Sequence, residues 1–337
     1  MKIVIFAGGI GTRLWPLSRK NSPKQFDRIF NNQSTLELAI QRIAPVFGLE
    51  NIFIQTAENF KQPIKKLIPD LPADNILTEP ARRNLAPAVC LAMTELKKRN
   101  YTEPVALLWA DHLMKDVDEF THALQVAEGL IKENPNRFVF LAEKPRFANN
   151  NLGWIHVGGD NKFLGWKYKP EQGECDKMFK SGQYFWNPGY FITNIDFLLE
   201  QYKTLAPEIY QAVTENNYTN APKVNFDEAI IEKTDLGNAV VIKTDMGWSD
   251  PGTLYALKEA LQKSVKGNVT QGQVVNLDSQ DCLTYNLEPK KLLTTVGLKG
   301  TVVINTKDAI IVVPKDKVKQ VTDLVAKLEK QGLEEYL

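Results

Sequence analysis

The feature that most constrains the fold is a short apolar segment that runs directly into a glycine-rich turn. Residues 2–7 are mostly apolar, and glycines follow at positions 8, 9 and 11. Glycine allows a tight turn and a close approach of the backbone to a ligand. A strand followed by such a turn is typical of the first βα unit of an α/β protein, where ligands bind beyond the carboxyl ends of the strands.

Positive charge follows the turn at Arg13 and Lys24. Successive N–H groups in a glycine-rich turn form an anion-binding concavity. Arginine adds bidentate contacts to phosphate, and lysine adds a mobile point charge. We therefore expect a polyphosphate-binding loop. The alternative is a βα turn that needs glycine only for its geometry.

Two well-known glycine motifs do not fit the loop. A Walker motif ends in Gly-Lys-Ser or Gly-Lys-Thr, whereas this chain has Gly11-Thr12-Arg13. A dinucleotide-binding fingerprint needs a third glycine where Leu14 stands, and an acid after the second strand, which is missing at residues 51–56. A nicotinamide-dependent dehydrogenase is therefore the weakest alternative.

Composition narrows the class of protein. The chain has 337 residues, 43% of them hydrophobic and 24% charged, with a net charge of +1. This balance is ordinary for a globular protein and gives no support to a nucleic-acid partner. The three cysteines are odd in number and far apart (Cys90, Cys175 and Cys282). They predict reduced thiols in a cytoplasmic protein. Because no apolar run approaches about 18 residues, we expect no membrane partner and no signal peptide.

Apolar segments alternate with helical patterns through the first half of the chain. The expected strands are residues 2–7, 51–55, 105–109 and 138–142, and the expected helices are residues 34–46, 58–67, 86–98 and 116–132. This alternation predicts an α/β fold with a parallel sheet and helices on both faces. Residues 143–250 are richer in Gly, Asn, Pro and aromatic residues, and we interpret them as insertions that cover the crevice.

The pattern changes near residues 263–268. Short strand patterns follow at residues 274–277, 283–285, 292–296, 301–305 and 309–313, and an amphipathic helix pattern at 315–330. We expect a catalytic domain over residues 1–264. A small β-rich domain that ends in a helix is expected over residues 268–337.

The start of the chain resembles a known family. Residues 7–19 read Ala-Gly-Gly-Ile-Gly-Thr-Arg-Leu-Trp-Pro-Leu-Ser-Arg, and residues 23–26 read Pro-Lys-Gln-Phe. This closely resembles the signature of the sugar-phosphate nucleotidyltransferases, in the form found in mannose-1-phosphate guanylyltransferases. The resemblance implies a Rossmann-like mixed sheet flanked by helices, and Mg²⁺-assisted transfer of a nucleotidyl group from GTP to mannose 1-phosphate. The nucleotide-binding residues then include Ala7, Gly8, Gly9, Gly11, Thr12 and Arg13.

Within this reading, Arg13 and Lys24 are the catalytic residues. Arg13 is expected at the β- and γ-phosphates, and Lys24 at the α-phosphate. Asp111 directly follows a predicted buried strand in Ala-Asp-His, where its carboxylate can hold Mg²⁺ against a triphosphate. Asp250 lies in Trp-Ser-Asp-Pro-Gly, which resembles the family's Trp-Ser-Asp-Val-Gly, whose aspartate is the second metal ligand. The alternatives are a turn or helix cap for Asp111 and an Asp-Pro-Gly turn for Asp250.

Residues 79–88 resemble the family's Glu-Pro-x-x-Arg-Asn-Thr-Ala-Pro-Ala, with Leu85 in place of threonine. A carboxylate can accept from both N1–H and the 2-amino group of guanine. Glu79 with Asn84 is therefore the expected reader of the base and nucleoside. The segment also suits the start of a helix, with Asn84 as the cap and Pro87 in the first turn, and both interpretations can hold together.

Weaker resemblances to the family are found in the segments that would bind the sugar phosphate. The family's sugar-phosphate ligands correspond to Gly153, Lys169, Asn187, Asp227 and Glu232. This chain departs from the family at Asn151, where a glycine is usual, and at Tyr168, where a glutamate contacts the sugar. Glu143-Lys144-Pro145 also spells the family's Glu-Lys-Pro tripeptide, but it comes too early in the chain, and we treat it as a coincidence.

Two other functions stay open beside guanylyl transfer to mannose 1-phosphate. One is nucleotidyl transfer to a different sugar 1-phosphate, for which the changes at Tyr168 and Asn151 leave room. The other is a nucleotide-sensing homologue without activity, which would be expected to lack Lys24 or an aspartate that this chain keeps. By analogy with the family, the small second domain could also provide a homodimer surface.

Overall fold

The computed structural model describes residues 1–9, 11–19, 25–26, 33–264 and 266–337, which form two compact units. The first unit contains Met1–Gly8, Ile40–Ala110 and Met114–Trp248. The second unit contains Gly9–Ala39, Asp111–Leu113 and Ser249–Leu337. The units are therefore interleaved in sequence, and the expected domain boundary near residues 264–268 stays a prediction.

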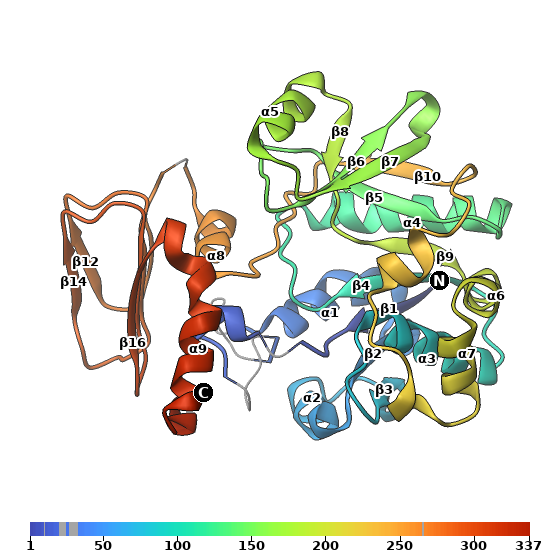
Figure 1. Cartoon of the computed structure of the whole chain (residues 1–337), viewed down its shortest axis with the longest axis horizontal. Coiled ribbons are helices and arrows are strands. Elements are labelled where there is room, and N and C mark those ends of the chain that lie inside the picture. The colour runs from blue at the N-terminus through green and yellow to red at the C-terminus, as the bar shows by residue number, and fades with distance from the viewer. Residues whose placement is uncertain (10, 20–24, 27–32, 265) are drawn as a thin grey trace. The chain divides into compact units, whose positions relative to one another are not determined.

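A mixed sheet forms the centre of the first unit (Figure 1). Its strand order is β3-β2-β1-β4-β9-β5-β8-β6-β7, with β10 beside β5. Neighbouring strands from β3 to β4 are parallel, as the sequence predicts, whereas β9 runs antiparallel to both β4 and β5. The strands are β1 (Lys2–Phe6), β2 (Ile52–Ala57), β3 (Ile76–Glu79), β4 (Pro104–Trp109), β5 (Val139–Glu143), β6 (Gly153–Val157), β7 (Phe163–Tyr168), β8 (Tyr184–Trp186), β9 (Phe191–Asn194) and β10 (Val240–Thr244).

The helices begin where the sequence supplies caps. Ser34 and Glu37 form a capping box at the first helix, since each backbone N–H donates to the other's side chain. Asp116 caps the fourth helix by accepting from the backbone N–H of Glu119 at 2.9 Å. The helices along this part of the chain are α1 (Thr35–Phe47), α2 (Lys61–Leu67), α3 (Leu85–Lys98), α4 (Val117–Glu133), α5 (Gln172–Ser181), α6 (Ile195–Leu205) and α7 (Pro207–Thr214).

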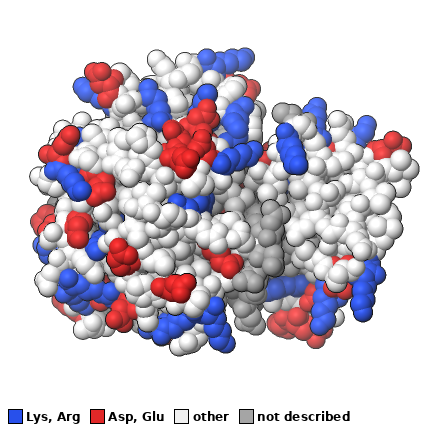
Figure 2. Space-filling view, turned by 180° about the vertical axis from the view of Figure 1, so that it is seen from behind, with Lys and Arg blue, Asp and Glu red and all other residues white. Residues whose placement is uncertain are grey.

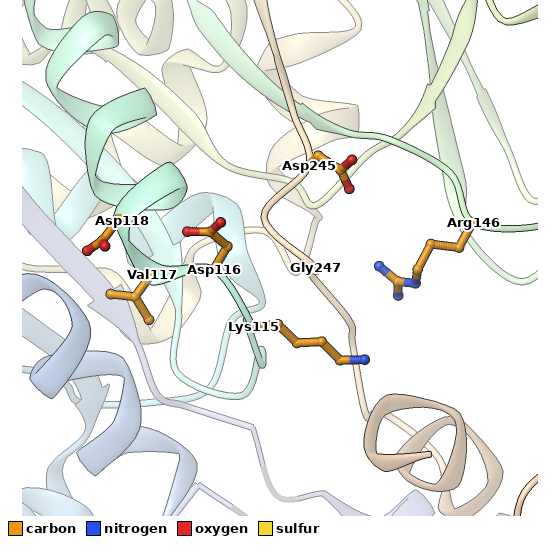
Figure 3. Close-up of a pocket in the computed structure, with 7 residues that line it drawn as sticks. All are labelled: Lys115, Asp116, Val117, Asp118, Arg146, Asp245 and Gly247. Carbon is orange, nitrogen blue, oxygen red and sulfur yellow. The ribbon is translucent and has the colours of Figure 1, made fainter. Parts of the chain in front are cut away.

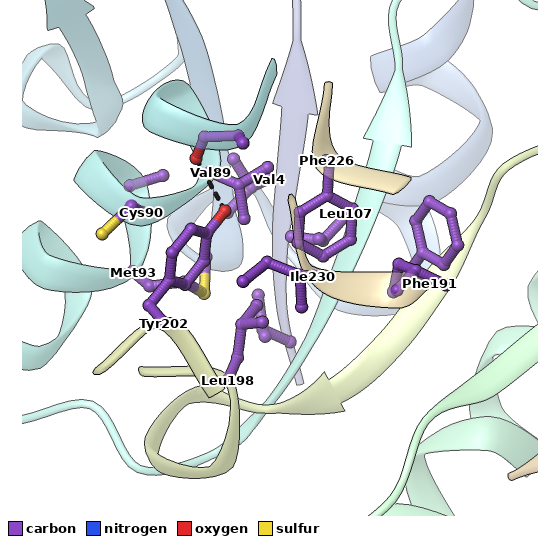
Figure 4. Packing of buried hydrophobic residues seen from close by; sticks show 14 of the residues in the cluster. Val4, Val89, Cys90, Met93, Leu107, Phe191, Leu198, Tyr202, Phe226 and Ile230 are labelled. Atoms are coloured by element: carbon purple, nitrogen blue, oxygen red, sulfur yellow. Dashed lines mark hydrogen bonds between the residues drawn. The ribbon is translucent and has the colours of Figure 1, made fainter. Parts of the chain in front are cut away.

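Helices α3, α6 and α7 contact one another and pack on one face of the sheet. Alternate residues of the central strands, such as Val4 on β1 and Leu107 on β4, point into this core. Figure 4 shows Tyr202 of α6 among these side chains. Its hydroxyl donates to the carbonyl of Ala86 in α3 at 2.6 Å, so this buried hydroxyl has a partner.

Residues 143–250 differ from the expectation. We interpreted them as insertions over the crevice, but β6, β7, β8, β9 and β10 all belong to the central sheet, and α6 and α7 complete its core. These strands carry many aromatic and polar residues instead of the continuous Val, Ile and Leu runs of buried parallel strands, which hid them in the sequence.

The second unit is built on short strands, as the sequence predicts. Strands β11, β13 and β15 pair in parallel, β16 is antiparallel to β15, and β12 pairs in parallel with β14. The expected helix over residues 315–330 begins as a 3₁₀ helix and becomes α-helical at Val321. The elements are α8 (Leu254–Leu261), β11 (Val269–Gln271), β12 (Val274–Leu277), β13 (Leu283–Asn286), β14 (Leu293–Val296), β15 (Thr301–Asn305), β16 (Ile310–Pro314) and α9 (Val321–Lys330).

Two further expectations concern cysteine and membranes. Cys90, Cys175 and Cys282 are free and buried, which agrees with reduced thiols. Within the described ranges, no helix has the length and apolarity that crossing a bilayer requires.

Candidate active site

The root of the glycine-rich loop is held by β2. The backbone N–H of Ala7 donates to the Gln55 carbonyl at 2.8 Å, and the Thr56 hydroxyl donates to the Ala7 carbonyl at 2.9 Å. The strand pairing therefore continues one residue beyond β1. It fixes where Gly8 leaves the sheet, at the carboxyl end of the parallel strands.

Only one of the three glycines, all of which the structure describes, takes a left-handed conformation. Gly11 has φ 64°, a value that other residues rarely adopt. A side chain at Gly8 would instead come within 3.5 Å of the Glu79 carboxylate, and Gly9 has open space around it. Gly8 and Gly9 therefore leave space for a ligand to approach the loop, and Gly11 provides the left-handed residue of its turn.

The rest of the loop is hydrogen-bonded to itself. Thr12–Leu14 forms a 3₁₀ helix, and the Gln25 amide donates to the Gly9 carbonyl at 2.7 Å. Ser18 donates to the Gly11 carbonyl. Arg13 is exposed and so can reach a ligand. Lys24, the other proposed catalytic cation, lies outside the described residues.

The segment after the loop is anchored on the end of the second unit, which sequence reasoning missed. The Trp15 indole donates to the Tyr336 carbonyl at 2.6 Å, and the Arg19 guanidinium donates to the same oxygen. Arg19 also pairs with Asp308 at 2.6 Å. Trp15 is buried in a core that draws on β13, β15 and α9, and its members include Leu14, Trp15, Leu17, Leu283, Val302, Val325 and Leu337. The apolar Leu-Trp-Pro-Leu run after the loop was the available signal.

The two proposed metal ligands lie on neighbouring backbone segments. Leu113 and Ser249 form an antiparallel bridge, with N–H to carbonyl distances of 3.0 and 2.9 Å. Asp111 lies two residues before this bridge and Asp250 one residue after it, so the bridge brings the two backbone segments that carry them side by side. Gly252 leaves room for the Asp250 carboxylate, because a Cβ there would be 3.0 Å from its Oδ1. Two half-buried carboxylates are a donor set that suits a hard divalent cation.

Glu79 ends β3 with its carboxylate buried beside the glycine-rich loop. One oxygen, Oε2, accepts from the Tyr218 hydroxyl at 2.5 Å, and Oε1 faces the space above Gly8. Burial raises the pKa of Glu79, and the hydrogen bond from Tyr218 and the charge of Arg82 oppose that rise. The site therefore holds a carboxylate that can accept hydrogen bonds at the edge of the loop.

Asn84 occupies the N-cap position of α3 with a positive φ of 63°. The expected cap position is confirmed, although the side chain of Asn84 makes no capping hydrogen bond. Pro87 lies in the first turn, as expected. The exposed amide of Asn84 therefore stays available to a ligand near Glu79.

Three of the five proposed sugar-phosphate ligands come together at one end of β6, β7 and β8. The Asn187 N–H donates to the Gly153 carbonyl at 2.8 Å, and a Cβ at Gly153 would lie 3.5 Å from that of Asn187. Lys169 follows β7, whose Tyr168 pairs with Gly153. The Lys169 ammonium lies 4.8 Å from the centre of the exposed Tyr168 ring.

The other two proposed ligands share a different element. Asp227 begins a π-helical turn, Asp227–Ile231, and the Glu232 N–H donates back to the Asp227 carbonyl at 2.8 Å. The pKa of Asp227 is raised by burial and also by the neighbouring charge of Glu232. Such π-helical turns are frequent at functional sites.

A pocket of about 660 Å³ lies at the start of α4, and sequence analysis selected none of its lining residues. Figure 3 shows Lys115 and Arg146 extending toward the same open region, with Asp245 nearby. Its lining residues are Lys115, Asp116, Val117, Asp118, Arg146, Asp245 and Gly247. Cationic and anionic side chains therefore oppose each other here, and the pocket shows no preference for a ligand of one sign.

Comparison with known proteins identifies the family. A family model described as nucleotidyl transferase matches residues 2–267. The chain belongs to the nucleotidyl transferase family. Residues 272–328 match a second model, described as a MannoseP isomerase/GMP-like beta-helix domain, which accounts for the strand-rich second unit of this nucleotidyltransferase.

Relatives of this nucleotidyltransferase extend over nearly its whole length. Mannose-1-phosphate guanylyltransferase RfbM of Salmonella typhimurium is 32% identical over 99% of this chain and 73% of its own length. Alginate biosynthesis protein AlgA of Pseudomonas putida is 31% identical over 98% of this chain and 72% of its own length. The resemblance noted in the sequence is confirmed.

Solved structures confirm the expected fold of mixed sheet, flanking helices and β-rich second part. A protein from Thermus thermophilus described as mannose-1-phosphate geranyltransferase superimposes with a TM-score of 0.86 at 28% identity. The match covers 97% of this chain and 99% of that protein. A glucose-1-phosphate thymidylyltransferase from Bacillus anthracis, at 16% identity and a TM-score of 0.53, shares the fold alone.

Proposed function

We propose that this nucleotidyltransferase transfers a guanylyl group from GTP to α-D-mannose 1-phosphate, giving GDP-mannose and pyrophosphate. The observation that carries the choice of GTP is the buried Glu79 carboxylate, with one oxygen directed at the space above Gly8. Guanine offers two donors on one edge, N1–H and the 2-amino group, that a carboxylate accepts. The relatives named mannose-1-phosphate guanylyltransferase support the choice of sugar.

The reaction needs no nucleophile from the protein. An oxygen of the sugar phosphate forms a bond to the α-phosphorus of GTP in line with the bond to the bridging oxygen. That bond breaks, and its electron pair leaves with pyrophosphate. Positioning and charge neutralisation then account for most of the catalysis. Arg13 acts on the β- and γ-phosphates, Lys24 on the α-phosphate, and Lys169 on the incoming sugar phosphate.

The metal is proposed from the donor set. Asp111 and Asp250 hold Mg²⁺, since their carboxylates lie on bridged segments and Gly252 leaves room beside one of them. When bound, Mg²⁺ neutralises phosphate charge and fixes the triphosphate. Ala7, the three loop glycines and Thr12 contribute to nucleotide binding, and Gly153, Asn187, Asp227 and Glu232 to the sugar phosphate.

The cellular location and the oligomeric state of the protein are also proposals. We place the protein in the cytoplasm because its cysteines are free, and the strand-rich second unit offers a surface for a homodimer. Figure 2 shows cationic and anionic side chains interspersed over one face, which suits small phosphorylated substrates better than nucleic acid.

A different sugar 1-phosphate is the second candidate substrate. Tyr168 stands where the family has a sugar-contacting glutamate, and this residue is 78% exposed. A tyrosine offers one hydroxyl in place of the two acceptor oxygens of a carboxylate, so the contacts to the sugar hydroxyls must differ.

The test is pyrophosphate release with Mg²⁺ across GTP, ATP, UTP and dTTP, each paired with the 1-phosphates of mannose, glucose, fucose and galactose. We expect release with GTP and mannose 1-phosphate. Release with another sugar 1-phosphate would support the proposed mechanism. It would also show that Tyr168 belongs to a sugar pocket of changed specificity. GTP binding without release in any pair would favour a nucleotide-sensing homologue.

A further inference from the structure

Tyr218 makes a contact that neither the sequence motifs nor the proposed mechanism uses. It lies in a 3₁₀ helix, Tyr218–Asn220, and its ring is buried in the core of the first unit. Its hydroxyl donates to Glu79 Oε2 at 2.5 Å, across 139 positions of sequence. A buried hydrogen bond to a carboxylate fixes the rotation of that group, because breaking it would leave a polar atom without a partner.

Within the described ranges, no hydrogen bond reaches the other oxygen, which is open to a ligand. Glu79 Oε1 is the nearest atom to the position that a Cβ at Gly8 would take, at 3.5 Å. This oxygen therefore lies beside the first glycine of the loop, where the nucleotide is proposed to bind. The amide of Asn84 follows five residues later, at the start of α3, without a bond to the helix.

We propose that Tyr218 is the positioning residue for base recognition, holding Glu79 so that its oxygen accepts from the N1–H edge of guanine. This inference rests on the proposed function, because it needs GTP as the substrate. Without the Tyr218 hydroxyl, Glu79 can rotate or become protonated, and a protonated carboxyl donates where the guanine edge also donates. Adenine, whose N1 is an acceptor, is then disfavoured less.

The first experiment replaces Tyr218 with Phe in the full chain and measures KM and kcat for GTP, inosine triphosphate and ATP. Loss of a hydrogen bond to a charged group is expected to raise the KM for GTP about ten-fold. Because the reacting phosphates are untouched, kcat should stay within about two-fold of wild type. Inosine triphosphate lacks the 2-amino group, so the preference for GTP over it should fall as the carboxylate loses its orientation.

The matched control is Tyr202→Phe. Tyr202 is also a fully buried tyrosine of this core, but its hydroxyl donates to the Ala86 carbonyl and does not touch Glu79. This control variant should lose stability and keep the wild-type selectivity among the three nucleotides. A purely structural role for Tyr218 would make the two variants behave alike.

A second variant keeps the test decisive if Tyr218→Phe folds poorly. In Glu79→Gln, Tyr218 should hold the amide oxygen and turn the NH₂ group toward the base. That converts an acceptor into a donor, so GTP use should drop at least ten-fold relative to ATP. Adding Tyr218→Phe to this variant frees the amide to flip and should recover part of the GTP use.

The outcomes separate the two proposals. Wild-type preference for GTP with an unchanged preference in Tyr218→Phe, or no recovery in the double variant, would overturn the role of Tyr218 alone. A wild-type chain that does not prefer GTP would overturn the proposed function and this inference together.

Discussion

Glu143 is the most enclosed carboxylate of the first unit, with no exposed surface. One oxygen accepts from the Met246 N–H and the Thr244 hydroxyl, and the other from the Trp248 N–H and the Arg146 guanidinium, at 3.0 to 3.3 Å. The tripeptide that we set aside as a coincidence therefore contains a structural anchor. It holds the turn that leads toward the proposed metal ligand at residue 250.

Burial raises the pKa of Glu143 to about 7, against the opposing effect of its four donors. The folded state thus retains a proton that the unfolded chain has lost, and stability falls as pH rises from about 4.5 to 7. We expect wild type to lose roughly 3 kcal/mol over this range relative to Glu143→Gln. Urea unfolding of both chains between pH 5 and 8 measures this, and a difference that stays constant or grows with pH would contradict it.

The proposed metal ligands make a second prediction at this scale. Asp111→Asn and Asp250→Asn should each lower kcat at least about 100-fold at fixed Mg²⁺, because each removes charge from a hard-cation site. More Mg²⁺ should recover part of the loss. The control is Asp245→Asn, an exposed residue paired with Lys144 at 2.9 Å, which should keep near-wild-type rates. Equal losses in all three variants would argue against a metal at residues 111 and 250.

A residue's role can be predicted from sequence where the residue belongs to a local motif. It cannot be predicted where the role depends on a partner far away in sequence. The loop glycines, Asp111 and Glu79 stand within motifs of a few residues. Tyr218 has no motif, because its proposed role comes from a hydrogen bond to a carboxylate 139 positions away. Asn84 takes the cap position that its motif predicts, but no local pattern showed that its backbone has a positive φ or that its side chain makes no capping hydrogen bond.

At the scale of elements, the turn between β11 and β12 depends on Gly272. Its φ is 80°, and a Cβ would stand 2.0 Å from the backbone carbonyl of Asn286, which cannot move without breaking the strand register. Gly272→Ala should therefore destabilise the second unit by about 2–4 kcal/mol, from backbone strain plus the clash.

The control for this prediction is Gly297→Ala. Gly297 also has a positive φ, of 69°, but its added Cβ meets nothing within 4 Å. Only the strain of about 1 kcal/mol is then expected. Thermal unfolding of both variants tests the contrast. Equal losses of stability would show that the contact between the added Cβ and the Asn286 carbonyl does not destabilise the protein.

Element positions followed well from local pattern, and strand direction did not. Strand β15 has the expected bounds, and β1 and β4 differ from expectation by a single residue. The antiparallel course of β9 was missed because direction in a sheet is set by neighbours far away in sequence. Periodicity also could not show that residues 315–320 wind as a 3₁₀ helix before α9 begins.

At the scale of the whole molecule, the second unit joins residues from both ends of the chain. Arg19 donates to the Tyr336 carbonyl, pairs with Asp308 and lies over the Trp15 ring. We expect Arg19→Leu to raise the KM for GTP about three- to ten-fold, because the segment after the glycine-rich loop loses its anchor. Steady-state kinetics and thermal unfolding together separate this effect from general instability.

Lys327→Ala provides the control, since this residue is exposed on α9 and its loss should leave KM unchanged. If Arg19→Leu also leaves KM unchanged, the contact with Tyr336 does not position the loop. No local pattern predicts such an interleaved unit, because its segments are separated by most of the chain.

The interleaving sets an order of events during synthesis. Leu14 and Trp15 are made well before their core partners in β15 and α9. At about 5–20 residues per second, the apolar segment waits roughly 15–60 seconds for the surface that covers it. Over that interval the nascent chain exposes a tryptophan and two leucines beside its glycine-rich loop. We therefore expect this stretch to be where chaperones engage the growing chain, and transferase activity to appear only after α9 has been made.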